Sequence, residues 1–325
     1  MAHPILPGCE PLSVAGSDLG VLVVHGFTGS PVSMRSLAEG FVARGYSVEM
    51  PLLPGHGTHI DDMVPTRWED WYGAAEAAYL DLTSRCSAVA VVGLSMGGGI
   101  SLALAENHAN VAALGLVNPM VLPLSQDLLD GIDLLLESGL EVFEAIGGDI
   151  AMEGVTEASY DGNPLRAGRS LSDAMETVSA NLGAITCPVL VCTSVQDHVV
   201  PPASADLILS DVSGPVRQVL LERSYHVATL DYDRELLEAE IFAHVDAVGF
   251  WVKATSGFPL SVDVAMLGRT TVGTTRLAMT KFATIVERRR RGHRRSGRRP
   301  SITAPSADAV TLTTHLRHTH CPREQ

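Results

Sequence analysis

The first 248 residues contain no lysine, and the first lysine of the chain is Lys253. These residues hold 33 Asp and Glu against 9 Arg, a net charge of −24, whereas residues 249–325 hold 4 acidic and 14 basic residues, a net charge of +10. An acidic surface repels phosphate backbones and anionic head groups. We therefore expect no nucleic-acid partner for residues 1–248 and favour an uncharged small-molecule substrate.

Long apolar runs are also missing, because none approaches the roughly 20 residues that a transmembrane helix needs. Residues 1–8 do not show the basic start and apolar stretch of a signal peptide. The five cysteines are odd in number, follow no metal-ligand spacing and are predicted to be small core residues. We expect a cytoplasmic protein with no transmembrane segment, no metal and no organic cofactor.

Short apolar runs bounded by Gly, Pro or Asp recur along the chain and predict β-strands. Segments with helical spacing lie between the early runs, and this alternation predicts an α/β fold with a mostly parallel, doubly wound sheet. The predicted strands are Gly20–Val24, Ser47–Met50, Ala88–Val92, Ala112–Val117, Val189–Thr193 and Val216–Leu221, and the predicted helices are Ser33–Arg44, Trp68–Thr83 and Met96–Glu106.

Residues 120–184 interrupt this rhythm and predict an inserted cap. Apolar residues recur at helical intervals from Leu128 to Leu136, and a Gly- and Asp-rich stretch and a second helical run follow. An insertion there would lie over the carboxyl edge of the sheet, where open α/β sheets bind ligands. Its apolar residues either line a slot for one acyl chain or pack against the body.

The folded domain is predicted to cover residues 1–248 and to close with a helix over Asp233–Val248. Residues 249–325 differ in composition, with near-continuous Arg and His between Glu287 and Arg299. Such a basic tail of low order is consistent with solvated disorder, with binding to acidic surfaces or nucleic acid, or with a shifted reading frame.

The segment Gly93-Leu-Ser95-Met-Gly97 follows a Val-rich strand and opens a predicted helix. In this context the Gly-x-Ser-x-Gly pattern is typical of a strained turn that exposes a nucleophilic serine, with glycines where strand and helix approach closely. Ser95 would also lie at the positive end of the helix dipole. We predict that Ser95 is a nucleophile.

A serine hydroxyl needs a base, and the base needs a carboxylate that fixes its tautomer. Asp197 follows the strand Val189–Thr193, and His226 follows the strand Val216–Leu221, so both lie on loops at the carboxyl edge in the expected order of serine, acid and histidine. They are the predicted acid and base.

Several rivals are less suitable for these roles. His198 precedes the last strand, Asp206 falls inside a predicted helix on the surface, and Asp231 is predicted to cap the closing helix. His25 and His56 lie in glycine-containing loops and are predicted to shape those loops.

The tetrahedral intermediate of acyl transfer carries an oxyanion, which needs preorganised donors. The N–H of Met96, directly after the nucleophile, is one candidate, and the N–H of Phe27, in the His-Gly loop after the first core strand, is the other.

With these segments identified, the chain resembles the bacterial monoacylglycerol lipases and small carboxylesterases of the α/β-hydrolase superfamily. The matching blocks are Val24–Gly29, Leu53–Thr58, Gly93–Gly98, Asp197–Pro201 and Ser224–Asp231. The resemblance implies a Ser95–Asp197–His226 triad, Phe27 and Met96 as oxyanion donors, and a small mobile cap that receives an acyl chain. We expect this cap to contact micelles or membranes transiently.

It also implies a cap carboxylate that contacts the glycerol hydroxyls, and Glu157 is the best match. The expected function is hydrolysis of monoacylglycerols through an acyl-Ser95 intermediate, with a general carboxylesterase for short to medium simple esters as the alternative. The cap is more acidic and glycine-rich than this family's, and the tail has no counterpart in it.

Overall fold

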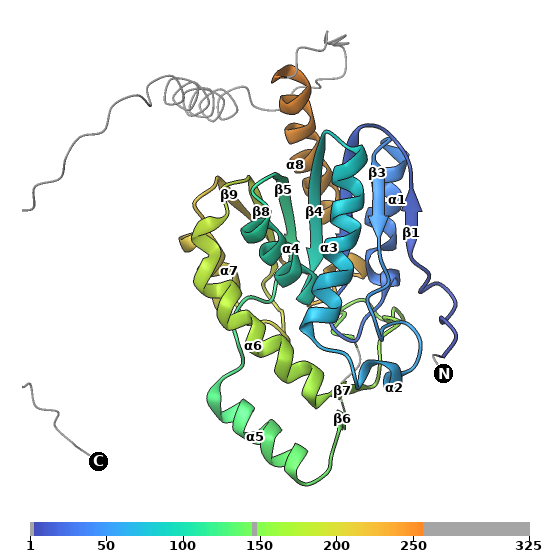
Figure 1. The fold of residues 1–325 in the computed structure, drawn as a ribbon, viewed down its shortest axis with the longest axis vertical. Helices are drawn as coiled ribbons and strands as arrows, with labels where there is room; N and C mark the ends of the chain where they lie inside the picture. The colour runs from blue at the N-terminus through green and yellow to red at the C-terminus, as the bar shows by residue number, and fades with distance from the viewer. Residues whose placement is uncertain (1–2, 145–147, 256–325) are drawn as a thin grey trace, which may run out of the picture. The chain divides into compact units, whose positions relative to one another are not determined.

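The computed structural model describes residues 3–144 and 148–255 of the chain. Seven strands form one sheet in the order β1-β3-β2-β4-β5-β8-β9, in which only the β1–β3 pair is antiparallel (Figure 1). The strands are β1 Leu12–Val14, β2 Leu19–Val24, β3 Ser47–Met50, β4 Ala88–Leu94, β5 Val111–Val117, β8 Val189–Ser194 and β9 Val216–Leu221. The predicted α/β class with a mostly parallel sheet is confirmed.

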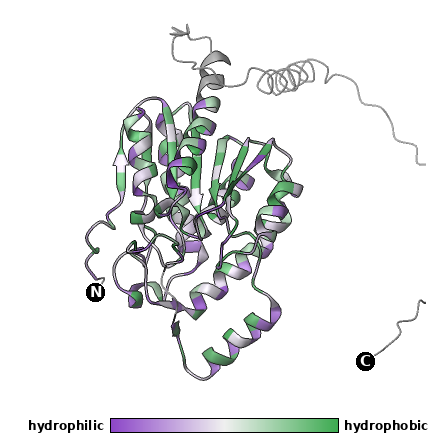
Figure 2. Ribbon diagram, turned by 180° about the vertical axis from the view of Figure 1, so that it is seen from behind, coloured by the Kyte–Doolittle hydropathy of each residue, from purple (hydrophilic) through white to green (hydrophobic). Residues whose placement is uncertain are grey.

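Helices cover both faces of this sheet because the strand side chains alternate between two apolar clusters. Leu22 and Val24 of β2 belong to the cluster that includes α3 and α4, whereas Val21 and Val23 belong to the cluster that includes α1 and α8. Figure 2 shows hydrophobic strands inside and mixed colours on the surrounding helices. The helices of the body are α1 Arg35–Ala43, α2 Ile60–Met63, α3 Trp68–Arg85, α4 Met96–Asn107, α7 Ala203–Asp211 and α8 Arg234–Thr255, with short 3-10 turns at Pro31–Met34, Leu182–Ala184 and Ala228–Leu230.

The predicted cap lies between β5 and β8. It contains α5 Gln126–Glu137, a two-stranded ribbon of β6 Val142–Glu144 and β7 Gly162–Pro164, and α6 Leu165–Asn181. The α6 helix buries Leu171, Met175 and Val178 in the main core, whereas α5 buries only Leu129. The second half of the insertion is therefore part of the body, and α5 forms its outer portion (Figure 1).

The cap differs from the prediction in one respect. Leu128 is 57% exposed and Leu134 is 67% exposed, so these two leucines face solvent and do not line a slot. Leu129 is the inward-facing residue of that turn, because its neighbours lie about 100° away around the helix.

The closing helix also differs from the prediction. It was predicted to end with the domain at Val248, but α8 continues to Thr255, so residues 249–255 of the predicted tail are helical. The remaining tail residues, 256–325, lie outside the described residues. Across the described ranges, every helix is too short or too polar to span a lipid bilayer.

Candidate active site

Ser95 occupies the turn between β4 and α4, and its backbone is strained. Its φ of 55° and ψ of −118° are unusual for a residue with a side chain, and such conformations cost about 1–3 kcal/mol. Hydrogen bonds hold the turn in place: the Ser95 N–H donates to Val117 O at 3.0 Å, and the Ser95 carbonyl accepts from the Met120 N–H at 3.0 Å.

The two glycines of the motif are required by close backbone approach. A Cβ at Gly93 would lie 2.1 Å from the carbonyl oxygen of Gly97, and a Cβ at Gly97 would lie 2.3 Å from the carbonyl oxygen of Val24. No side chain fits at either position, so α4 begins directly above the sheet. The predicted reason for these glycines is confirmed.

Asp197 and His226 are in contact on the loops after β8 and β9. His226 Nδ1 lies 2.8 Å from Asp197 Oδ2, and both side chains are more than nine-tenths buried. The other carboxylate oxygen accepts the N–H groups of Val199 and Val200, each at 2.8 Å. The carboxylate is thereby fixed toward Nδ1, which leaves Nε2 of the imidazole to act as a proton acceptor.

Comparisons with known proteins agree with this fold. The profile of the family described as "Alpha/beta hydrolase family" matches residues 21–239. The chain belongs to the alpha/beta hydrolase family.

Its relatives include a thermostable monoacylglycerol lipase of Bacillus sp. (strain H-257), to which this hydrolase is 40% identical over 239 residues, or 72% of this chain and 93% of that protein. It is 28% identical to a carboxylesterase of Bacillus subtilis (strain 168), over 73% of this chain and 96% of that protein. A solved structure from work on two metagenome-derived lipolytic enzymes, LipS and LipT, has a TM-score of 0.71 at 39% identity, covering 75% of this chain and 100% of that one.

Asn118, at the end of β5, links the strand before the acid to the loop of the base. Its side chain accepts the Ser194 N–H at 2.7 Å and donates to the His226 carbonyl at 2.7 Å and to Ser194 Oγ at 2.9 Å. Its φ of 42° lies in the left-handed region, which asparagine tolerates better than most residues. Sequence reasoning missed this residue, because its partners lie 76 and 108 positions away.

The loop that carries Phe27 lies against the serine turn. A Cβ at Gly26 would be 3.4 Å from Ser95 Cβ, and the Phe27 ring packs edge-on against Trp71 with centroids 5.5 Å apart. The other predicted donor, Met96, begins α4, where the first N–H groups of a helix have no intrahelical acceptor. The hydrolase therefore presents two backbone segments beside the hydroxyl of Ser95.

His25 and His56 support this loop, as predicted. His25 is fully buried, contacts the carbonyl oxygen of Gly26 through Nδ1 at 2.9 Å and accepts the Leu53 N–H through Nε2 at 3.2 Å. Burial lowers the pKa of His25 to about 4 and, together with the neighbouring His25, lowers the pKa of His56 to about 3. Both rings are therefore neutral near pH 7, and backbone groups occupy both ring nitrogens of His25.

Glu157 lies beside the same loop. The Glu157 Oε1 would lie 2.8 Å from a Cβ added at Gly29, and the Glu157 Cβ would lie 2.9 Å from a Cβ added at Gly148. The Ser33 hydroxyl is hydrogen-bonded to the Glu157 carboxylate. Burial of the carboxylate raises its pKa, an effect that the nearby His226 and Ser33 oppose. The residue suggested for the cap carboxylate therefore lies close to the predicted base.

Asp149 connects the cap to the loops that carry Asp197 and His226, and sequence reasoning missed it. Its Oδ2 accepts the N–H groups of His226 and His198, each at 3.1 Å, and its Oδ1 lies 2.8 Å from His198 Nδ1. The Val227 N–H donates to its backbone carbonyl at 3.0 Å. His198, the rival base, is therefore paired with the cap.

The prediction for Asp231 was wrong, whereas Asp206 lies exposed on α7 as predicted. Asp231 does not cap α8. Its carboxylate accepts the N–H groups of Ala151 at 2.7 Å, Tyr225 at 2.9 Å and Met152 at 3.0 Å. N–H groups of the cap segment and of the loop that carries His226 therefore occupy this carboxylate, which is not free to cap α8.

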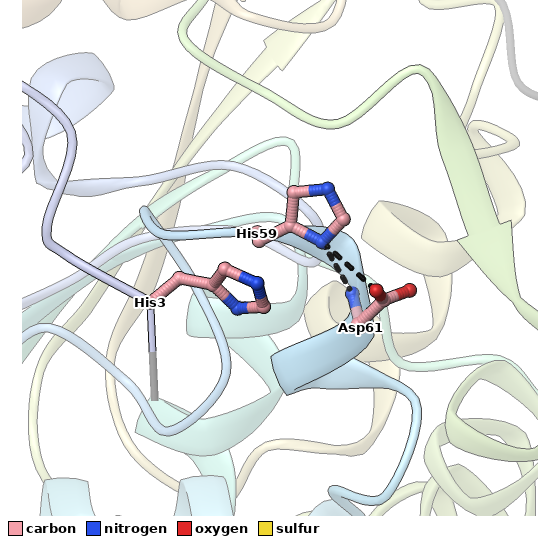
Figure 3. A group of neighbouring side chains, drawn as sticks. All are labelled: His3, His59 and Asp61. Atoms are coloured by element: carbon pink, nitrogen blue, oxygen red, sulfur yellow. Dashed lines mark hydrogen bonds and ion pairs between the residues drawn. The ribbon is translucent and has the colours of Figure 1, made fainter. Parts of the chain in front are cut away.

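Sequence reasoning predicted no metal ligands, but one cluster with suitable donors occurs among the described residues. His3, His59 and Asp61 lie together on the surface (Figure 3). They lie outside the Ser95 site.

Proposed function

We propose that this hydrolase cleaves carboxylic esters through an acyl-Ser95 intermediate and that monoacylglycerols are its preferred substrates. The observation that carries this proposal is the buried 2.8 Å contact between His226 and Asp197, at the edge of the sheet where the strained Ser95 turn follows β4. The 40% identity to a monoacylglycerol lipase supports the substrate class.

In the proposed mechanism, His226 takes the proton of Ser95 while Ser95 Oγ attacks the ester carbonyl carbon. The N–H groups of Phe27 and Met96 stabilise the oxyanion of the tetrahedral intermediate. When that intermediate collapses, the carbon–oxygen bond breaks and the protonated His226 gives its proton to the leaving alcohol. His226 then activates water to release the fatty acid and regenerate Ser95. Asp197 orients the imidazole and stabilises its positive charge.

Glu157 supports glycerol recognition, because a partly enclosed carboxylate beside Gly29 is suited to accept hydrogen bonds from alcohol hydroxyls. A site built to bind hydroxyl groups discriminates against substrates that lack them, since its buried acceptors would be left unpaired.

The test compares kcat/KM for 1-lauroylglycerol and ethyl laurate, which share an acyl chain and differ in the alcohol. We expect a preference for the glycerol ester of at least about tenfold, equivalent to about 1.4 kcal/mol. Glu157→Gln should reduce that preference with little effect on ethyl laurate, whereas Glu153→Gln, an exposed cap position, should retain it. Equal rates on the two esters would instead support a general carboxylesterase, the name of the second relative.

We also propose a cytoplasmic protein whose cap contacts substrate micelles transiently. Leu128, Leu134 and Phe143 expose apolar side chains on the outer part of the cap, at 57%, 67% and 52%. Leu134→Ser should weaken binding to lauroylglycerol micelles while leaving hydrolysis of a short soluble ester unchanged, and equal micelle binding would contradict this role.

A further inference from the structure

Two histidines and an aspartate from distant parts of the chain meet at the start of α2 (Figure 3). His3 belongs to the N-terminal segment, His59 precedes α2, and Asp61 lies in its first turn. One ligand atom from each side chain lies within 4.8 Å of the other two. We propose that these residues form a structural site for a divalent transition-metal ion of the zinc class.

A carboxylate holds one ring nitrogen of His3. Its Nδ1 lies 3.0 Å from Asp62 Oδ1, and its backbone N–H donates to Asp62 Oδ2 at 3.0 Å. The carboxylate favours the proton on Nδ1, which leaves the lone pair of Nε2 free to bind an ion. Metal-bound histidines usually show this arrangement, with a carboxylate on the second ring nitrogen.

His59 and Asp61 place two acceptors opposite each other. His59 Nδ1 accepts the Asp61 N–H at 3.3 Å, and the same nitrogen lies 3.3 Å from Asp61 Oδ2. A cation bound to this nitrogen and to the carboxylate would replace that long hydrogen bond from the N–H, because one lone pair cannot serve both partners. Within residues 3–144 and 148–255, no Lys or Arg forms an ion pair with Asp61 or Asp62.

Two imidazoles and one carboxylate suit Zn²⁺, Ni²⁺ or Cu²⁺, whereas Mg²⁺ and Ca²⁺ prefer oxygen ligands alone. Zinc bonds of about 2.0–2.2 Å in a tetrahedral site place the ligand atoms about 3.4 Å apart, so this cluster must contract on binding. The side chains of His59 and Asp61 are 52% and 72% exposed and have room to rotate. Water would complete the coordination, and the expected affinity is micromolar.

Such an ion would fasten the N-terminal segment to the loop between β3 and α2. That segment already touches the loop, because the Leu6 N–H donates to Gly57 O at 2.8 Å. The cap holds the loop from the other side, since Tyr160 OH accepts the Thr58 N–H at 3.0 Å and donates to Gly55 O at 2.7 Å. The ion would stabilise this junction and take no part in ester hydrolysis.

The test is calorimetric titration of ZnCl₂ into the metal-stripped, untagged full-length protein, together with thermal unfolding. We expect this site to bind one equivalent of zinc with micromolar affinity, and we expect that affinity to fall at least tenfold in His3→Gln and in His59→Gln. Zinc should raise the Tm by a few degrees only when this site is intact. His108→Gln is the matched control, because His108 pairs with Glu76 at 2.8 Å, away from this cluster, and the variant should bind like the wild type.

Zinc ligands elsewhere in the chain are the same in the wild type and in the His3→Gln and His59→Gln variants, so a difference in zinc binding between them reports on this site. Circular dichroism checks that each variant is folded. Equal zinc stoichiometry and affinity in the wild type and the His3→Gln and His59→Gln variants would overturn the proposal, as would a wild type that binds no zinc.

Discussion

At the scale of single residues, the elbow that presents Ser95 depends on the absence of side chains at two positions. Gly97→Ala would place a methyl group 2.3 Å from the Val24 carbonyl, so we expect a loss of about 3 kcal/mol or more in the free energy of unfolding. Gly73→Ala is the control: among the described residues, nothing beyond the local helix backbone lies within 4 Å of a Cβ there, and in helix α3 it should stabilise by about 0.5–1 kcal/mol. Urea unfolding measures both, and a Gly97→Ala protein as stable as the wild type would contradict the packing account.

Sequence was sufficient to select Ser95, Asp197 and His226 because each lies shortly after the end of a recognisable strand, and the order of the three restricts the choice. Their catalytic roles are still predictions. Asn118 and Asp149 could not be selected in this way, because each acts through partners more than 45 positions away, and no local spacing marks them. Asp231 was misjudged because its local position, near the start of a helix, resembles that of an ordinary cap.

At the scale of elements, Asp149 joins the cap segment between β6 and β7 to the loops that carry Asp197 and His226. Asparagine has only one side-chain acceptor oxygen and cannot replace both carboxylate oxygens toward His198 and His226. We therefore expect Asp149→Asn to lower kcat about tenfold, or about 1.4 kcal/mol, with a smaller change in KM.

Steady-state kinetics on a soluble short ester measure this effect without any contribution from micelle binding. Asp161→Asn is a suitable control, because this cap aspartate is exposed and makes no hydrogen bond within the described part of the chain. Unchanged kcat in Asp149→Asn would show that the cap segment does not position the base.

The long elements were predictable for a physical reason: buried strands such as β2 are continuous apolar runs between turn residues, and their helices repeat at 3.6 residues. The β1, β6 and β7 strands contain three residues each, too few to show a period. The end of α8 was placed too early because the composition of the chain changes after Val248 while the backbone continues as a helix to Thr255.

At the scale of the whole molecule, buried neutral histidines connect stability to pH. Burial lowers the folded-state pKa of His56 from 6.5 to about 3, so the unfolded chain binds a proton that the folded protein excludes. The resulting stabilisation is complete above pH 6.5 and is lost as the pH falls toward 3.

His56→Gln should remove this contribution. Between pH 6 and 4 the unfolding free energy of the wild type should fall more steeply than that of the variant, by up to about 1.4 kcal/mol per pH unit for one proton. Urea denaturation across this range measures the difference, and parallel curves for the two proteins would show that the ring is protonated in the folded state.

The proposed ester hydrolysis also belongs to the whole molecule, because its site combines residues from distant parts of the chain. The most direct measurement is labelling by a fluorophosphonate probe, read by mass spectrometry, together with hydrolysis of 1-lauroylglycerol, for the wild type, Ser95→Ala and the exposed-site control Ser84→Ala. We predict that the probe modifies Ser95, that Ser95→Ala loses labelling and at least about 10⁴-fold in kcat, and that Ser84→Ala behaves as the wild type. Labelling and turnover that persist in Ser95→Ala would contradict the assignment of Ser95 as the nucleophile.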